Sequence, residues 1–453
     1  MSRKPKSKTF QAPKGMNDVL PESQKYWEKF FKVAQELADY YNFKTIETPV
    51  LEFADLFKKG IGLETDVIEH EMYTLKTKGG DFLALRPELT ASAVRAYIEN
   101  GFANQPQPVK FFHWGPVFRH ESAQAGRYRE FHQADFDVIG EGDPIIDAQI
   151  IQVVYVILNE LGLKGLSIHI NSVGDKNCRG KYRDELKMYY RNKINRLCKN
   201  CKRRFKENPL RMLDCKEEEC AALKESAPSS IDYLDKDCRD HFKSVLEFLD
   251  ELGVPYVLDS YLVRGLDYYT RTVFEIVPEE ATGSQIAIAS GGRYDYLISQ
   301  LGGKPAPAMG GSIGIERAIN EMRRQNVKIG AIKTKARVFL VQLGDLAKKK
   351  SLRLFEDFRK NNIHISESFG RDSIKAQLRV ADRQGADLAL IIGQKEALDG
   401  TVILREMYSG TQEIIPSEKI IDEVKKRLKK LPSRVPAAEN NDLKYPPENN
   451  LKS

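Results

Sequence analysis

Two segments of alternating side chains, at residues 108–121 and 129–139, most strongly constrain the fold of this 453-residue chain. In the second segment, Phe136 and Val138 alternate with polar side chains, which is the period of a β-strand with one buried face. The polar, glycine-containing stretch 122–128 joins the two segments and indicates an antiparallel pair. Because few crossover helices separate the predicted strands, we predict an α+β fold built on an antiparallel sheet flanked by helices.

The polar face of the second strand is the first candidate for a binding site. It carries Phe131, Gln133, Asp135 and Asp137, an aromatic ring with an amide and two carboxylates, which suits a ligand better than a core. The span from Phe131 to Asp137 is about 20 Å at ~3.3 Å per residue, long enough for a nucleotide joined to an amino acid. An ordinary solvent-facing sheet surface would show the same alternation, so this strand alone leaves both interpretations open.

A second candidate is the segment 262–269, which places Arg264 among Leu, Val and Tyr. A guanidinium cannot escape burial by losing its proton, so it requires an anionic partner. That partner is either a carboxylate of the protein, for example Asp267, or the phosphate of a ligand. The glycine-rich segments 290–295 and 310–317 come later, and glycines ahead of a helix can offer backbone amides to an anion.

The composition changes along the chain indicate its domain organisation. The basic residues 1–14 predict a disordered arm, and residues 15–330 a first domain. A highly charged helical insertion, at about residues 175–242, interrupts this domain and holds all six cysteines. Residues 335–431 alternate as β-α-β-α-β, which indicates a separate α/β domain, and the Pro- and Asn-rich residues 432–453 predict a disordered tail.

Four cysteines of the insertion form a cluster, Cys198-x2-Cys201 followed by Cys215-x4-Cys220. Paired thiolates at such spacing suit a tetrahedral structural Zn²⁺ ion. The second pair is wider than the usual two-residue gap, so four reduced thiols in a charged insertion are the alternative.

The overall composition, with 30% charged and 41% hydrophobic residues, is typical of a soluble globular protein. No run approaches the ~18 apolar residues of a membrane helix, so we expect no membrane association. The basic N-terminus has no apolar stretch after it, so we expect no secretory signal and a cytoplasmic location. The net charge of +7 permits a polyanionic partner without requiring one.

Taken together, these motifs resemble those of the histidyl-tRNA synthetase family, which belongs to the class II aminoacyl-tRNA synthetases. The segments 118–121 and 314–317 are similar to class II motifs 2 and 3. The segments 262–269 and 291–294 are similar to the two histidine-binding signatures of the family. Further matches lie at residues 15–18, 86–90 and 381–386, so that the resemblance extends from about residue 13 to about residue 428.

The resemblance implies a class II catalytic domain over residues 15–330 and an anticodon-binding domain over residues 335–431. The implied reaction activates L-histidine with ATP and Mg²⁺ to histidyl-adenylate and pyrophosphate, and then transfers histidine to the 3′ end of tRNA(His). The resemblance also implies a homodimer, formed through residues 44–49, which are similar to motif 1.

The same resemblance assigns roles to individual residues. Arg119 would hold the ATP α-phosphate, and Arg264 would lie beside it as the second catalytic cation, where other class II enzymes use a metal ion. The residues implied to bind ATP are Arg119, Glu121, Phe131 and Arg317. The residues implied to bind histidine are Glu88, Leu89, Thr90, Arg119, Gln133, Asp137, Arg264, Tyr268, Tyr269 and Tyr294.

The loop before the second strand is implied to approach the acceptor end of the tRNA, through Gln124, Arg127 and Arg129. One position departs from the family pattern, because Asp137 stands where many members have Glu. The histidines at positions 113, 120 and 132 are expected to have structural or RNA-contacting roles rather than acid–base roles.

Two other function classes fit parts of the sequence. Synthetase-like paralogues act as regulatory subunits of ATP phosphoribosyltransferase, but they lack the C-terminal domain and usually lose the arginine signatures. A catalytically silent RNA-binding module is the other class. Arg119, Arg264 and Arg317, together with the extra α/β domain, favour the enzyme.

Overall fold

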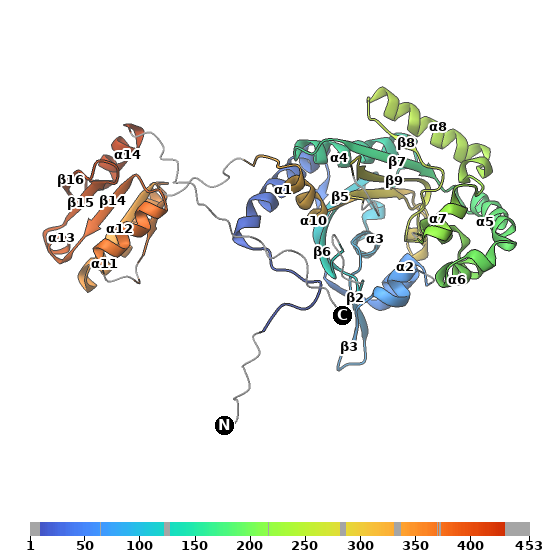
Figure 1. Cartoon of the computed structure of the whole chain (residues 1–453), viewed down its shortest axis with the longest axis horizontal. Helices are drawn as coiled ribbons and strands as arrows, with labels where there is room; N and C mark the ends of the chain where they lie inside the picture. Colours follow the sequence, from blue (N-terminus) through green and yellow to red (C-terminus); the bar gives the residue numbers. More distant parts are fainter. Residues whose placement is uncertain are drawn as a thin grey trace. The chain divides into compact units, whose positions relative to one another are not determined.

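The computed structural model of the chain, shown in Figure 1, separates into two compact units, residues 1–330 and residues 331–453. The structure describes residues 10–63, 65–121, 127–215, 217–280, 287–329, 337–368, 370 and 373–430. The predicted tail and most of the predicted N-terminal arm therefore lie outside the described residues. No helix in the described ranges combines the length and the apolar character needed to cross a membrane.

The first unit is built on an eight-stranded sheet with the strand order β1-β5-β6-β11-β10-β9-β7-β8. Its neighbouring strands are antiparallel except for the two edge pairs, β1 with β5 and β7 with β8. The α+β prediction is therefore confirmed. The strands are β1 (Lys44–Thr45), β5 (Val109–Phe118), β6 (Glu130–Ile139), β7 (Leu166–Ser172), β8 (Val257–Leu258), β9 (Thr270–Pro278), β10 (Ala289–Arg293) and β11 (Ala308–Gly314).

One face of this sheet packs on helices to form the main core. Ala134, Phe136 and Val138 of β6 are fully buried in this core, which also contains side chains of α4. Helix α4 begins with a capped turn: the Asp143 carboxylate accepts a hydrogen bond from the Ile145 amide, and Pro144 follows the cap. The helices of this layer are α1 (Pro21–Tyr40), α4 (Pro144–Glu160), α8 (Lys236–Glu251) and α10 (Ile315–Arg324).

A second core lies around a small sheet with the order β2-β4-β3. Two short strand patterns within residues 72–86 flank Lys78-Gly79-Gly80-Asp81, which predicts a hairpin, and they form the β3–β4 pair of this sheet. This core also buries Tyr268 and Tyr294 beside the end of the main sheet. Its elements are β2 (Leu51–Phe53), α2 (Ala54–Ile61), η1 (Val67–Glu71), β3 (Thr74–Lys76), β4 (Phe82–Leu85), α3 (Thr90–Glu99), η2 (Phe102–Asn104) and α9 (Leu297–Gln300).

The insertion is helical, as predicted, and has a core of its own. That core includes Tyr182, Leu186 and Tyr190, and it also buries Leu262 and Val263, the two residues before Arg264. The insertion therefore supports the segment that carries this arginine. Its helices are α5 (Lys176–Arg191), η3 (Ile194–Arg196), α6 (Lys199–Glu207), η4 (Pro209–Asp214), α7 (Glu218–Lys224) and η5 (Ser230–Tyr233).

The second unit has helices on both faces of a five-stranded sheet with the order β13-β12-β14-β15-β16. The predicted β-α-β-α-β alternation corresponds to its parallel strands β12, β13 and β14. The sequence analysis missed the antiparallel strands β15 and β16 that follow. The elements are β12 (Val338–Gln342), α11 (Asp345–Lys360), β13 (Ile365–Glu367), α12 (Ile374–Arg383), β14 (Leu388–Ile392), α13 (Gln394–Asp399), β15 (Thr401–Glu406), β16 (Gln412–Pro416) and α14 (Ile420–Lys430).

The glycine-rich segments form strands β10 and β11 at the centre of the main sheet, and the expectation that they offer amides to an anion is wrong. Gly291 pairs with Gly311, and both strands have hydrogen-bonded neighbours on each side. A Cβ atom on Gly291 would lie 2.2 Å from the Gly310 carbonyl oxygen and 2.6 Å from the Phe274 ring. These glycines therefore allow the strands to pack closely. The helix predicted after them is confirmed, and it begins at Ile315.

We predict that Gly291→Ala destabilises the protein by at least about 2 kcal/mol, because backbone and ring atoms must move to admit the methyl group. The matched control is Gly180→Ala on helix α5, where an added Cβ meets nothing within 4 Å. This control should raise the free energy of unfolding by about 0.5–1 kcal/mol. Urea unfolding of the full chain measures both, and a Gly291→Ala protein as stable as wild type would contradict the packing account.

Candidate active site

A cavity of about 460 Å³ lies in the first unit, lined by the main sheet and by part of the insertion. A smaller cavity of about 110 Å³ shares one wall with it. The structure brings the four residues predicted to bind ATP to these two cavities, although they come from distant parts of the sequence. The residues predicted to bind ATP, histidine or tRNA that line these cavities are Arg119, Glu121, Arg127, Phe131, Gln133, Arg264 and Arg317.

Arg264 has a carboxylate partner, and that partner is Glu275 on strand β9. Its guanidinium also donates a hydrogen bond to Ser290 Oγ at 2.6 Å and lies 5.7 Å from the centre of the Tyr269 ring. Pairing with Asp267, the example offered from the sequence, is wrong because Asp267 accepts a hydrogen bond from Asn208 instead. Both Arg264 and Glu275 line the large cavity, so a ligand phosphate could reach the arginine.

Arg119 and Arg317 place two more positive charges beside the cavity. Arg119 donates from Nε to the Pro87 carbonyl at 2.9 Å, and its guanidinium carbon lies 5.4 Å from the centre of the Phe131 ring. Arg317 donates to the Ala287 carbonyl at 2.8 Å. Burial, with Arg119 nearby, lowers the pKa of Arg317 to about 10, so the side chain is still charged at neutral pH. Together with Arg264, these side chains place three guanidinium groups along the wall that the two cavities share, where each can donate hydrogen bonds to an anion.

The polar floor of strand β6 holds buried acceptors. Gln133 donates from Nε2 to Ser312 Oγ at 2.8 Å, which leaves its carbonyl side facing away from that bond. Among the described residues, Gln133 Oε1 and one oxygen of Asp135 are buried without a hydrogen-bond partner. Buried polar atoms are normally paired, so these two acceptors fit a ligand that brings N–H groups, such as an ammonium ion.

Asp137 is buried and both of its carboxylate oxygens have protein partners. One oxygen lies 2.7 Å from His113 Nε2, and the other accepts from the hydroxyl of Tyr294. Gly310 makes room for this carboxylate, because a Cβ there would lie 2.3 Å from Asp137 Oδ1. Asp137 therefore joins strands β5 and β6 to the end of β10.

Six of the other residues predicted to bind histidine lie buried next to the cavities rather than on their walls, and the seventh, Tyr269, is half-buried. Glu88 uses both oxygens to accept from the Thr90 and Ala91 amides, each at 2.7 Å, and so caps helix α3. Burial raises the pKa of the Glu88 carboxyl. The buried residues that line neither cavity are Glu88, Leu89, Thr90, Asp137, Tyr268 and Tyr294.

Comparison with known proteins decides which family this site belongs to. The family model described as histidyl-tRNA synthetase matches residues 15–318, and the anticodon binding domain model matches residues 337–427. The chain belongs to the histidyl-tRNA synthetase family. It is 44% identical over 419 residues to the histidine–tRNA ligase of Dehalococcoides mccartyi, covering 92% of this chain and all of that relative.

Solved structures agree with this family assignment. The apo histidyl-tRNA synthetase of Staphylococcus aureus is 32% identical with a TM-score of 0.74, over 92% of this chain and 99% of that one. A Bacillus halodurans chain described as an ATP phosphoribosyltransferase regulatory subunit/histidyl-tRNA synthetase has 22% identity and a TM-score of 0.60. It covers 86% of this chain and 99% of its own length, and at that identity it shows a shared fold alone.

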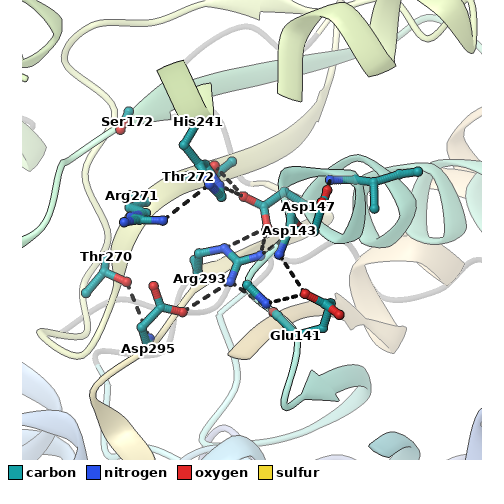
Figure 2. Close-up of polar contacts among 12 residues, drawn as sticks. Glu141, Asp143, Asp147, Ser172, His241, Thr270, Arg271, Thr272, Arg293 and Asp295 are labelled. Atoms are coloured by element: carbon teal, nitrogen blue, oxygen red, sulfur yellow. Dashed lines mark hydrogen bonds and ion pairs between the residues drawn. The ribbon is translucent and has the colours of Figure 1, made fainter. Parts of the chain in front are cut away.

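A buried polar network around Arg293 was not predicted from the sequence; it is drawn in Figure 2. Arg293 lies in residues 291–294, which are similar to the second histidine-binding signature of the family. Arg293 is fully buried and forms an ion pair with Asp147 of helix α4 at 2.7 Å. The other oxygen of Asp147 accepts from Thr272 Oγ1 at 2.7 Å and lies 2.7 Å from His241 Nε2. Because Tyr294 follows Arg293 directly, this network fixes the end of β10 that carries the tyrosine. The available signals were Asp147 among the mostly apolar residues 145–151 and Arg293 in a glycine-rich segment.

The insertion forms one wall of the large cavity through a cluster of charges that was also not predicted. Asp66 lies 2.7 Å from guanidinium nitrogens of both Arg204 and Arg211, and Arg203 pairs with Glu69 at 2.6 Å. These ion pairs tie helix α6 and η4 to η1. No pattern in the sequence indicated which carboxylates would face the insertion.

Of the residues predicted to approach tRNA, Gln124 lies outside the described residues. Arg127 lines the cavity, 3.4 Å from Glu121, and Arg129 donates to the Glu121 carbonyl at 3.2 Å. The three histidines have structural partners in the described part of the chain. These are Asp137 for His113, Glu316 for His132 and the Tyr73 ring for His120.

We predict that Asp135 makes stability fall as pH rises. Burial raises the pKa of its carboxyl to about 7, against a lowering by His113, while the unfolded value is about 3.9. The folded state holds this proton more tightly than the unfolded state does. The contribution of the protonated carboxyl to the free energy of unfolding is therefore fully present below pH ~4 and is lost as pH rises to ~7. Asp135→Asn should therefore gain about 2 kcal/mol relative to wild type between pH ~5 and pH ~8.

Urea unfolding of the full chain across this pH range measures the effect. The control is Asp240→Asn, which removes the same charge from an exposed position on helix α8. Its free energy of unfolding should change with pH as that of wild type does. If the Asp135→Asn and wild-type curves are also parallel, the buried carboxyl does not titrate as described.

Proposed function

We propose that the chain is a histidine–tRNA ligase that forms histidyl-adenylate from L-histidine and ATP and then transfers histidine to the 3′ end of tRNA(His). The observation that carries this proposal is the grouping of Arg119, Arg264 and Arg317 around one cavity in a member of this family. Three cations from three motifs match the demands of a triphosphate better than those of a neutral ligand.

The first step needs positioning and charge more than acid–base chemistry. The histidine carboxylate attacks the α-phosphorus in line and pyrophosphate leaves, so two anions are brought together. Arg119 and Arg264 would stabilise the negative charge that builds up on the α-phosphate oxygens. No side chain needs to remove a proton, because a carboxylate is already ionised at neutral pH.

The ion pair between Arg264 and Glu275 supports a role for Arg264 as a preorganised cation. Glu275 and Ser290 hold the guanidinium at the cavity wall before any ligand arrives. The α-phosphate would take up donors of the same guanidinium fork. Carboxylates also line the cavity at Glu71 and Glu275, and hard oxygen atoms of this kind suit the Mg²⁺ that accompanies the β- and γ-phosphates of ATP.

The adenine and the histidine would occupy the two ends of the polar floor. Phe131 would stack on the adenine ring and Glu121 would accept from its amino group, while Arg317 would hold the γ-phosphate. The buried acceptors of Gln133 and Asp135 would receive the histidine ammonium group. Of the remaining residues predicted to bind histidine, Tyr269 and Tyr294 would contact the substrate directly. Others would position the residues that contact it, as Glu88 does by capping the start of α3.

We propose for Asp137 a different role from the one implied by the family pattern. Its two oxygens are bonded to His113 and Tyr294, so it would position the tyrosine that faces the substrate imidazole. Asp is one methylene shorter than the Glu of many family members, so a contact between Asp137 and the histidine amine through a water molecule is a further prediction.

We propose that tRNA binds through both units. The matched anticodon binding domain at residues 337–427 would hold the anticodon arm. Arg127 at the cavity would attract phosphates of the acceptor end, and Arg129 and Gln124 stay predicted contacts of the same loop. We further propose a cytoplasmic homodimer that forms through residues 44–49, because β1 lies at an edge of the main sheet.

A regulatory subunit of ATP phosphoribosyltransferase is the second candidate, since a chain described in those terms shares the fold. Such a subunit would bind histidine without needing a triphosphate site. The three cavity arginines and the matched anticodon binding domain favour the ligase.

We also propose that the cysteine cluster of the insertion binds a structural Zn²⁺ ion. The Sγ atoms of Cys198, Cys201, Cys215 and Cys220 all lie within 4.8 Å of one another. The distance between the Cys198 and Cys215 sulfurs is 3.8 Å. Tetrahedral zinc with Zn–S bonds of about 2.3 Å places its sulfurs about 3.8 Å apart. Cys198 and Cys215 line the large cavity, so the ion would brace its wall.

We predict that Arg264→Ala lowers the rate of histidyl-adenylate formation by at least about 100-fold, the scale of one lost charge stabiliser. Single-turnover kinetics with the full chain measure this step apart from tRNA transfer. Arg264→Lys should recover part of the rate, because it keeps the charge without the planar fork. Arg191→Ala, exposed at the end of α5, is the matched control. A near-normal rate in Arg264→Ala would refute the assigned role.

We predict that Cys215→Ser loses one equivalent of zinc relative to wild type, because three ligands hold the ion far less tightly than four. Elemental analysis of the purified full chains counts the metal. Lys199→Ala, on the same segment, should retain the wild-type content. Equal zinc in wild type and Cys215→Ser would show that the cluster is four reduced thiols.

A further inference from the structure

A short sequence repeat occurs at the two ends of the insertion, and the ligase reaction does not account for it. The segments are Asp175-Lys-Asn-Cys178 and Asp235-Lys-Asp-Cys238. Each aspartate caps a helix: the Asp175 carboxylate accepts from the Cys178 amide at 3.1 Å, and that of Asp235 accepts from the Cys238 amide at 2.9 Å. Helices α5 and α8 therefore begin in the same way.

The two segments face each other in space. The Asp235 amide donates to Cys178 Sγ at 3.1 Å, which crosses from one segment to the other. One ligand atom from each of Asp175, Cys178, Asp235 and Cys238 lies within 4.8 Å of the other three. Cys178 is 2% exposed and Cys238 is fully buried, so solvent does not separate the sulfurs. Within the described residues, this group and the four-cysteine cluster are the two with such geometry.

We propose that Asp175, Cys178, Asp235 and Cys238 form a second metal site, which binds a tetrahedral Zn²⁺ ion with two sulfur and two oxygen ligands. Both pairs have the i, i+3 spacing of structural zinc sites, which is closer to the usual pattern than the wider pair of the first cluster. Two thiolates select a borderline-soft ion over Mg²⁺ or Ca²⁺. Binding releases the two thiol protons, and the positive ends of α5 and α8 offset the negative charge of the ligands.

The location gives this ion a structural role. Helix α5 is the first helix after β7 and α8 is the last before β8, so the ion would join the chain where it enters and leaves the insertion. The turn before the site is tight: Gly174 has φ +66°, and a Cβ on it would lie 2.4 Å from Cys178 Cβ. A metal clip at this base would hold the insertion, and with it the cavity wall, against the main sheet.

The test compares zinc content in variants of the full chain. Asp235→Asn removes a carboxylate ligand but keeps a side chain that caps helices well, so helix α8 should still form. It should lose one equivalent of zinc relative to wild type, and Cys178→Ser should lose the same equivalent. Asp237→Asn is the matched control, because it removes an equal charge from an exposed position on the same turn and should keep the metal.

The result does not depend on ligase activity or on the four-cysteine site. If wild type holds two equivalents, Asp235→Asn and Cys215→Ser each retain one. If the four-cysteine site binds nothing, Asp235→Asn loses the single equivalent and Cys215→Ser keeps it. Equal zinc in wild type, Asp235→Asn and Cys178→Ser would overturn the proposal and show that the repeat serves only as a pair of helix caps.

Discussion

The buried ion pair between Arg293 and Asp147 is the interaction on which the active-site end of the sheet depends (Figure 2). Both side chains are fully excluded from solvent, and removing one partner of such a pair costs about 3–5 kcal/mol because the other charge is left buried. Arg293 closes strand β10, Asp147 lies on α4, and His241 brings in α8 from the end of the insertion. One carboxylate thus holds together the sheet, its covering helix and the insertion.

That rigid frame explains how charged groups can line the cavity. Asp137 fixes the next position, Tyr294, and the glycines of β10 and β11 allow the strands to pack closely behind the polar floor. Arg264 is held from two sides, by Glu275 of the sheet and by the apolar core of the insertion beneath Leu262 and Val263. A triphosphate would therefore meet cations whose positions are already set, which is the condition for stabilising charge in the transition state.

Sequence patterns predicted what depends on short-range periodicity. The β5–β6 pair, the apolar face of β6, the β3–β4 hairpin and the helix after Gly314 all follow from alternation or helix-start signals. Arg264 and the polar face with Phe131 and Gln133 were candidates from the residue pattern. The grouping of Arg119 with Arg317 followed from the family resemblance, because no local pattern relates these two residues. The partners of the ion pairs could not be predicted from the sequence. Arg264 pairs with Glu275 of strand β9 rather than with Asp267 nearby in the sequence, and Asp66 pairs with Arg211 of the insertion, which is distant in the sequence. The prediction that the two glycine-rich segments bind an anion was wrong, because closely packed central strands and anion-binding loops both require glycine.

We propose that the protein activates histidine with ATP at the cavity that Arg119, Arg264 and Arg317 line. Isotope exchange between pyrophosphate and ATP, measured with the purified full chain and each of the amino acids in turn, tests it most directly. We predict exchange that depends on L-histidine and on Mg²⁺ and that occurs without tRNA. Absence of exchange with histidine, or equal exchange with other amino acids, would contradict it.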